Sequence, residues 1–132
     1  MKILLADDDA VTRTVVAHRL RRWGHEVVEV DDGAQADRLL STDLSIDLAV
    51  LDWVMPEMDG IGVTVAARAR AVGQRPYIIL LTGKDRFADR IAALEAGVDE
   101  FLPKPADPEL LAQRLDRAHQ VLFGPDARPA GR

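Results

Sequence analysis

The chain alternates between two kinds of hydrophobic pattern. Short apolar runs typical of strands are separated by longer segments whose apolar residues recur at helical spacing. The runs lie at Lys2–Ala6, Glu26–Val30, Asp47–Leu51, Tyr77–Leu81 and, more weakly, Glu100–Leu102. The helical stripes are Val11, Val15, Leu20 and Trp23, then Phe87, Ile91 and Leu94, and finally Leu111, Leu115, Ala118 and Leu122. Five strands that alternate with five helices predict an α/β fold, a parallel sheet with helices on both faces.

Turn and cap residues agree with these boundaries. Three glycines follow helical segments, at positions where a left-handed residue commonly ends a helix. They are Gly24, Gly73 and Gly97. Asp107 followed by Pro108 predicts an N-cap and the first turn of a last helix. Residues 1–123 are therefore expected to form one domain, while Gly124–Arg132, rich in Pro, Gly and Ala, is expected to be a frayed tail or the start of a linker.

Polar residues follow four of the five apolar runs. They are Asp7, Asp8 and Asp9 after the first run, Asp52 after the third, Thr82, Gly83 and Lys84 after the fourth, and Lys104 after the fifth. Each aspartate alone is compatible with an ordinary turn or helix cap. In open α/β sheets, however, the functional crevice lies at the carboxyl ends of the strands. We therefore expect carboxylates, a hydroxyl and an ammonium to meet at one edge of the sheet.

The chemistry of such a site follows from its charges. Several carboxylates at close range repel one another, so without a counter-ion the pKa of at least one would rise. Mg²⁺ suits a site with two carboxylates, water and a phosphate. An aspartate is also a competent nucleophile toward phosphoryl groups. Metal, ammonium, hydroxyl and backbone N–H groups can each stabilise an oxygen of the transferring group.

Composition narrows the alternatives. The 132 residues include no cysteine, which excludes disulfides and thiolate chemistry and fits a reducing, cytoplasmic compartment. The formal charge of −5 argues against direct binding of nucleic acid. The apolar runs are far shorter than the roughly 20 residues of a membrane span, and the first residues do not resemble a signal peptide.

At this point the sequence resembles the receiver domains of two-component response regulators. The similarity covers roughly residues 2–122 and rests on the order and spacing of four motifs. These are LLADDD at residues 4–9, DWVMPEMDG at 52–60, LTG at 81–83 and KP at 104–105. The resemblance implies a CheY-like, flavodoxin-like fold: a five-stranded parallel sheet in the order 2-1-3-4-5 with five helices on both faces.

The resemblance also assigns roles at the acidic end of the site. It implies that Asp52 is the phosphoacceptor and that Asp8 and Asp52 bind Mg²⁺ directly. The backbone carbonyl of Val54 would be a further protein ligand, and Asp7 would act through a bound water. The neighbouring Trp53 is expected to lie near the pocket.

Other roles carried over from the family concern the phosphoryl group and the switch. Lys104, Thr82 and the N–H of Gly83 would contact phosphoryl oxygens, and Lys104-Pro105 would be a cis peptide. Thr82 and Phe101 match the family's switch pair, although Phe101 is also compatible with a plain core aromatic. Lys84 would either contact phosphate or an acidic partner, or be a variable surface residue.

The family implies a signalling phosphoacceptor that catalyses only its own phosphorylation and dephosphorylation. A histidine kinase or phosphotransfer protein would supply the phosphoryl group. A downstream effector protein or a fused output domain would respond, with phosphorylation-dependent homodimerisation as a further option. No direct contact with nucleic acid or membrane is expected.

Three other interpretations stay open from the sequence. A haloacid-dehalogenase-type phosphatase would use Asp7 and Asp9 before Val11, with Asp107 or Asp116 as its later acidic residue. A flavodoxin-like electron carrier would share the sheet order, but three aspartates in its phosphate loop would repel the flavin phosphate. A degenerate receiver would bind partners without being phosphorylated.

Overall fold

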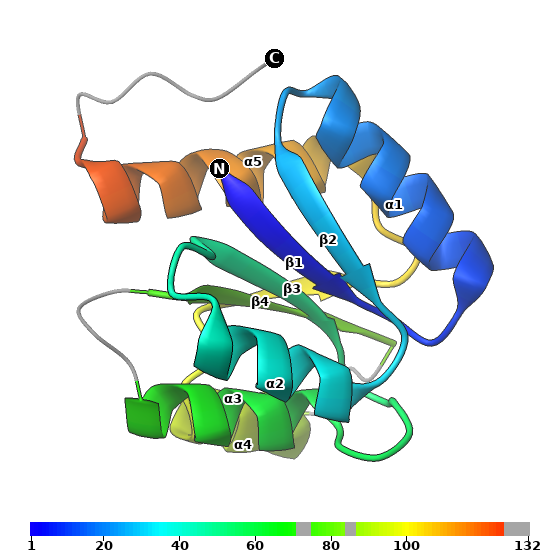
Figure 1. Ribbon diagram of the computed structural model, residues 1–132, viewed down its shortest axis with the longest axis vertical. Helices are drawn as coiled ribbons and strands as arrows, with labels where there is room; N and C mark the ends of the chain where they lie inside the picture. Colours follow the sequence, from blue (N-terminus) through cyan, green and yellow to red (C-terminus); the bar gives the residue numbers. More distant parts are fainter. Residues whose placement is uncertain (71–74, 84–86, 126–132) are drawn as a thin grey trace.

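The computed structural model describes residues 1–70, 75–83 and 87–125 (Figure 1). Within these residues the chain forms five strands and five helices in strict alternation. The strands are β1 (Lys2–Ala6), β2 (Glu26–Val30), β3 (Leu48–Asp52), β4 (Tyr77–Thr82) and β5 (Glu100–Pro103). The helices are α1 (Ala10–Arg22), α2 (Gly33–Thr42), α3 (Gly60–Arg70), α4 (Phe87–Ala96) and α5 (Pro108–Phe123).

The strands form one parallel sheet in the order β2-β1-β3-β4-β5. This order is the one implied by the family resemblance, and it confirms the expected flavodoxin-like α/β fold. Each parallel connection needs a crossover, and the helices supply it. The strand order reverses between β1 and β3, so the carboxyl ends of these two strands flank the switch point.

Helices cover both faces of the sheet and create two hydrophobic cores. α1 and α5 lie on one face, and α2, α3 and α4 lie on the other (Figure 1). Along β1, Ile3 and Leu5 enter the core beneath α1 and α5, while Leu4 and Ala6 enter the opposite core. Every residue of the central strands β3 and β4 is buried, as expected for parallel strands covered on both sides.

Three strand boundaries differ slightly from the sequence prediction. β3 begins at Leu48 and includes Asp52, β4 includes Thr82, and β5 extends to Pro103. The reason is pairing, because Asp52 lies opposite Leu81 and Thr82 lies opposite Pro103 in the sheet register. The polar residues predicted to follow the strands are therefore held partly by the strands themselves.

Two of the predicted helical stripes mark the helix correctly but misjudge part of its buried face, since Leu20 and Trp23 of the first stripe do face the core. In α1 the buried side chains are Val16, Ala17 and Leu20, whereas Val11 is 72% exposed and Val15 is 48% exposed. Val11 precedes Leu20 by about two and a half helical turns, so it lies on the opposite side of the helix. The stripe of α5 is confirmed, with Leu111, Leu115 and Ala118 buried and Leu122 packed against the same core.

Among the side chains of α4 that the structure describes, the small Ala93 is the one that is fully buried. Ile91 and Leu94 remain 40% and 55% exposed. A small side chain allows the helix to approach the sheet closely, and the larger apolar residues beside it are left at the surface. Apolar spacing therefore located this helix but did not identify the side that faces the core.

Helix ends follow the predicted caps. Gly24 and Gly97 have φ values of 89° and 109°, the left-handed conformation in which glycine is favoured. Gly73 lies outside the described residues. The Asp107 side chain accepts a hydrogen bond from the Leu110 N–H at 3.0 Å, which confirms it as the N-cap of α5.

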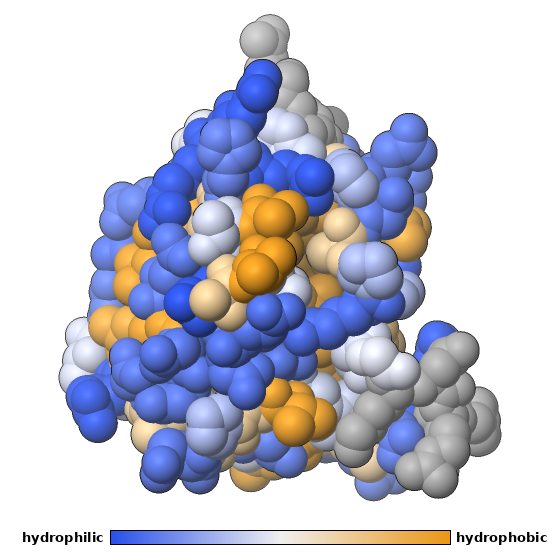
Figure 2. Space-filling view, turned by 90° about the vertical axis from the view of Figure 1, so that its right-hand side faces the viewer, coloured by the Kyte–Doolittle hydropathy of each residue, from blue (hydrophilic) through white to orange (hydrophobic). Residues whose placement is uncertain are grey.

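The side of the molecule on the right of Figure 1 is mostly hydrophilic, with small groups of hydrophobic surface between polar ones (Figure 2). The larger apolar side chains are concentrated in the two internal cores instead. Among the described residues, no helix combines the length and the apolar composition that a membrane span needs.

Candidate functional site

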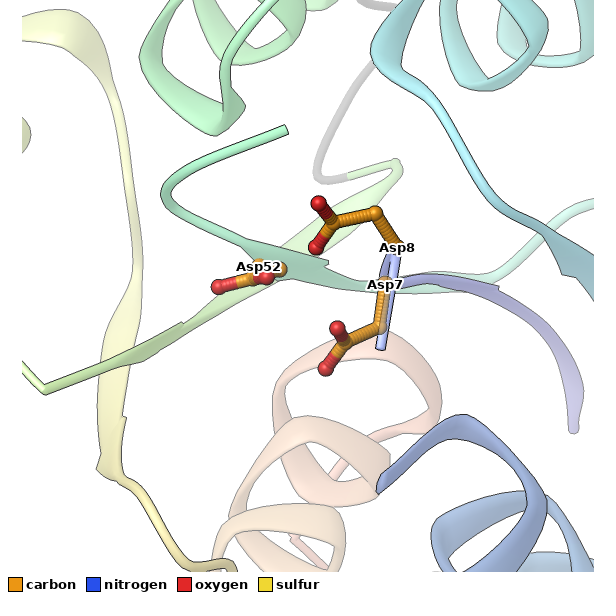
Figure 3. A group of neighbouring side chains, drawn as sticks. All are labelled: Asp7, Asp8 and Asp52. Carbon is orange, nitrogen blue, oxygen red and sulfur yellow. The ribbon is translucent and has the colours of Figure 1, made fainter. Parts of the chain in front are cut away.

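Three carboxylates meet at the carboxyl ends of β1 and β3. Ala6 pairs with Leu51 in the sheet, so the residues that follow them, Asp7 and Asp52, are brought side by side. Asp8 comes next in the loop after β1. One ligand atom from each of the three aspartates lies within 4.8 Å of the others. Figure 3 shows the three carboxylates gathered at this point, two from the loop and one from the end of β3.

Lys104 completes the charged group at the same edge of the sheet, where it follows β5. Its Nζ lies 3.1 Å from Oδ2 of Asp52 and 3.2 Å from Oδ2 of Asp7. Asp7 is fully buried and Asp52 is 5% exposed, whereas Asp8 is open to solvent. Two nearly buried carboxylates therefore share one ammonium, and the third carboxylate borders the entrance.

This environment changes the proton affinity of the central carboxylate. Burial raises the pKa of Asp52 to about 6, and the nearby Asp7 charge acts in the same direction, while Lys104 opposes both. Burial works against the charge on Lys104, but its contacts with Asp52 and Asp7 outweigh this effect, so its pKa lies above the ordinary value. The site thus contains more negative charge than its single lysine balances.

A hard divalent cation fits this arrangement. Carboxylate oxygens are the ligands that Mg²⁺ prefers, and one or two carboxylates with water and phosphate oxygens usually complete its shell. Asp8 and Asp52 offer such oxygens within one small space, and the buried Asp7 adds a charge that favours a cation. The excess negative charge and the donor set therefore match a Mg²⁺ site.

β5 and the residue after it aim the lysine. The Lys104 backbone N–H donates to the Thr82 carbonyl at 3.0 Å, which continues the pairing of β4 with β5 beyond Pro103. The Lys104–Pro105 peptide is cis, as the family resemblance implied. The side chain then reaches across the end of β4 to the aspartates on β1 and β3.

The loop after β1 is held by contacts that the sequence reasoning only partly anticipated. The Asp9 N–H donates to Oδ1 of Asp7 at 2.9 Å, and the Asp9 side chain caps α1 by accepting from the Val11 N–H and the Thr12 hydroxyl. Arg13 was missed: its guanidinium donates to the Asp7 carbonyl at 2.7 Å. Its place one turn into the helix after the acidic loop could have indicated this contact.

The predicted phosphoryl-binding and switch residues line one cleft at the end of β4 and β5. Thr82 is buried at the end of β4, next to β3, and Gly83 is exposed just beyond it. Phe101 is partly buried and packs against the core formed with α2, α3 and α4. A cleft of about 380 Å³ connects this region. It is lined by Thr82, Gly83, Arg90, Glu100, Phe101, Pro103, Lys104 and Arg114.

The loop after β3 supplies the remaining candidates. Trp53, directly after Asp52, is buried in the hydrophobic core formed with α2, α3 and α4. The Val54 side chain, two residues after Asp52, is 63% exposed. Lys84 lies outside the described residues.

The geometry also bears on the phosphatase alternative. Asp9, the second aspartate of the motif that this alternative would use, serves as the N-cap of α1. Asp107, one candidate for its later acidic residue, caps α5 instead. Asp116 lies within α5, about two helical turns after its first residue. Helix capping therefore explains two of the aspartates on which that alternative depended.

Comparison with known proteins agrees with the fold and the acidic group. The model of the response regulator receiver domain matches residues 3–116. The Chemotaxis protein CheY homolog of Campylobacter jejuni is 34% identical over 117 residues, which cover 88% of this chain and 90% of the relative. The chain belongs to the response regulator receiver domain family, whose members act in two-component phosphorelay signalling.

Two solved structures illustrate the contexts of similar domains. The receiver domain of the sensor histidine kinase PA1611 from Pseudomonas aeruginosa, with magnesium coordinated in its active-site cleft, is 35% identical with a TM-score of 0.78. That match covers 92% of this chain and 96% of the other. A probable response regulator/GGDEF domain protein is 29% identical with a TM-score of 0.85, covering 92% of this chain and 50% of that protein.

Proposed function

We propose that Asp52 accepts a phosphoryl group in a Mg²⁺-dependent reaction and that the phosphorylated domain then switches a partner-binding face. The observation that carries this proposal is the position of Asp52. Its carboxylate lies 3.1 Å from the Lys104 ammonium, with Asp7 and Asp8 close by, at the open end of the sheet.

In the proposed reaction a carboxylate oxygen of Asp52 attacks the phosphorus atom of the donor. For a phosphohistidine donor the new O–P bond forms while the N–P bond breaks, and the histidine nitrogen keeps the electron pair and takes up a proton. The reacting oxygen must be ionised, and the contact with Lys104 favours that form against the effect of burial.

Asp8, Asp52 and the Val54 carbonyl would hold Mg²⁺, with Asp7 acting through a water. When bound, the ion would balance the carboxylate charge and the charge of the incoming phosphoryl oxygens. Lys104 would lie toward one phosphoryl oxygen, and the Thr82 hydroxyl and the Gly83 N–H toward the others. The exposed Val54 side chain cannot orient a water by hydrogen bonding, so it would not assist hydrolysis in that way.

Thr82 and Phe101 are the proposed switch. Both line the same cleft, so movement of Thr82 toward a phosphoryl group would change the space available to Phe101. The outcome would be a shift between two packings of the surface formed by α4, β5 and α5. In this role the domain would be a signalling phosphoacceptor that acts catalytically only on its own phosphorylation state.

The proposed donor is a phosphohistidine of a histidine kinase or of a phosphotransfer protein, and the proposed location of the reaction is the cytoplasm. The responding element would be a separate effector or a fused output domain, with homodimerisation as one possible response. A similar receiver domain makes up half of a GGDEF protein, which supports a fused output domain, and the CheY homolog matched over 90% of its own length supports a separate effector.

Mass spectrometry of the intact protein tests the central step. Incubation with acetyl phosphate and Mg²⁺ should add one phosphoryl group to the wild-type chain and none to Asp52→Asn. Full labelling of Asp52→Asn would contradict the proposal. No labelling of the wild type would favour a degenerate receiver, and steady hydrolysis of phosphomonoesters that needs Asp7 and Asp9 but not Asp52 would favour the phosphatase.

A further inference from the structure

The loop between β3 and α3 touches the start of α2 through backbone atoms. The Pro56 carbonyl accepts two hydrogen bonds, from the Met58 N–H at 2.9 Å and from the Gly33 N–H at 3.3 Å. Gly33 is buried and is the first residue of α2. A helix from another part of the chain thus supports the loop that follows Asp52.

This contact depends on the missing side chain of Gly33. A Cβ atom at this position would lie 1.6 Å from the Met58 carbonyl oxygen and 2.5 Å from its carbonyl carbon. Both are backbone atoms and cannot turn aside as a flexible side chain can. Any larger residue at position 33 must therefore push α2 and the loop apart.

The loop itself has little freedom to absorb such a push. Glu57 has a φ of 72°, a left-handed conformation that is uncommon for residues other than glycine. At the two ends of the loop, the Trp53 N–H donates to the Leu81 carbonyl and the Gly60 N–H donates to the Trp53 carbonyl. The segment is therefore fixed next to the sheet at its ends and against α2 in its middle.

We infer that Gly33 is a positioning residue for the Mg²⁺ site. By admitting the close contact with Met58, it fixes the loop that carries Val54, whose carbonyl is the proposed third protein ligand. This inference rests on the proposed function of Asp52 and adds a residue that does not itself touch the ion or the phosphoryl group. Asp32 supports the same contact, because its side chain caps the start of α2 by accepting from the Gln35 N–H at 2.8 Å.

The test is the dissociation constant for Mg²⁺, measured by isothermal titration calorimetry on the folded chain. We expect Gly33→Ala to weaken Mg²⁺ binding by about tenfold, the size seen when outer contacts of a metal site are removed. Asp32→Ala loosens the same helix start without adding an atom, and it should weaken binding in the same direction. It decides the question if Gly33→Ala does not fold.

Three matched variants separate this role from general destabilisation. Gly62→Ala adds a Cβ whose nearest contact is the flexible Met58 side chain, 2.9 Å away, and should leave Mg²⁺ affinity unchanged. Val16→Ala weakens the core on the other face of the sheet, and Asp31→Ala removes an exposed charge beside Asp32; both should also bind like the wild type.

The outcomes distinguish the two proposals. If the wild type binds Mg²⁺ and folded Gly33→Ala and Asp32→Ala bind it equally well, the positioning role is wrong while the proposed function stands. If Val16→Ala loses as much affinity as Gly33→Ala, the effect is one of stability and the inference is also wrong. If the wild type itself does not bind Mg²⁺, the proposed function fails first.

Discussion

At the residue scale, the central feature is a carboxylate held where its charge is costly. Asp52 is nearly buried, faces the fully buried Asp7 and has one ammonium to share with it. Functional groups are often held in such unfavourable positions, where the surrounding fold supplies the energy to keep them there. In this domain the arrangement should attract a cation and a phosphoryl group, at some cost to the stability of the chain without them.

That cost predicts a pH dependence. The pKa of Asp52 is raised to about 6 in the folded chain, against about 3.9 in an unfolded one, so the folded state binds more protons between these values. The stability that this group contributes is therefore complete below pH 4 and is lost as the pH rises through 6. In Mg²⁺-free buffer, Asp52→Asn should exceed the wild type by about 2 kcal/mol in unfolding free energy at pH 7, and by much less at pH 4.

Urea denaturation across this pH range, with a chelator present, measures the difference. Asp31→Asn, an exposed carboxylate, is the control and should follow the pH profile of the wild type. Parallel profiles for the wild type and Asp52→Asn would show that burial of this charge does not strain the fold.

At the element scale, capping decides where helices begin beside the site. Asp9 starts α1, Asp32 starts α2 and Asp107 starts α5, each by accepting a backbone N–H of the first turn. The first two caps also border the acidic loop and the loop after β3. The same residue type thus serves as a cap and as a site group within a few positions of the chain, and only its hydrogen bonds distinguish the two roles.

The cap of α5 gives a prediction about stability alone. Asp107→Ala removes the acceptor for the Leu110 N–H and should lower the unfolding free energy by about 1 kcal/mol. Asp107→Ser keeps a capping oxygen and should recover most of the loss. Thermal denaturation of the pair checks this, and equal loss in both variants would mean that the cap contributes little.

At the scale of the whole molecule, the sheet order brings together residues from distant parts of the chain. Lys104 leaves β5 and Asp7 leaves β1, yet their side chains meet, because β3 and β4 are the only strands between them and the lysine spans the end of β4. Lys2 lies at the opposite end of the sheet, where β1 begins, and pairs there with Asp43.

The position of Lys104 beside the aspartates predicts opposite effects of its removal on Mg²⁺ binding and on phosphoryl transfer. Lys104→Met removes a positive charge from the acidic group, so Mg²⁺ should bind at least as tightly as in the wild type. The phosphoryl group loses a stabilising contact, so labelling by acetyl phosphate should slow by at least about tenfold. Lys2→Met should change neither value, and an unaltered labelling rate in Lys104→Met would remove the lysine from the proposed reaction.

The sequence by itself determined the alternation of strands and helices, the caps at Gly24 and Asp107, and the polar residues at the ends of the strands. These features depend on spacing and on neighbours within a turn or two, so they can be read along the chain. The sheet order and the individual site roles came from the resemblance to receivers, and the structure bears out the order. The roles of Asp52, Thr82 and Phe101 stay predictions.

Only the tertiary structure decided which helix faces are buried, that Asp7 is completely enclosed, that Lys104 reaches two carboxylates, and that Gly33 lies against the Met58 backbone. Apolar spacing misjudged part of the inner side of α1 and α4, because it takes account only of neighbours along the chain. Burial, close approach and pKa depend on atoms that are far apart in the sequence, and these are placed by the packing of the helices on the sheet.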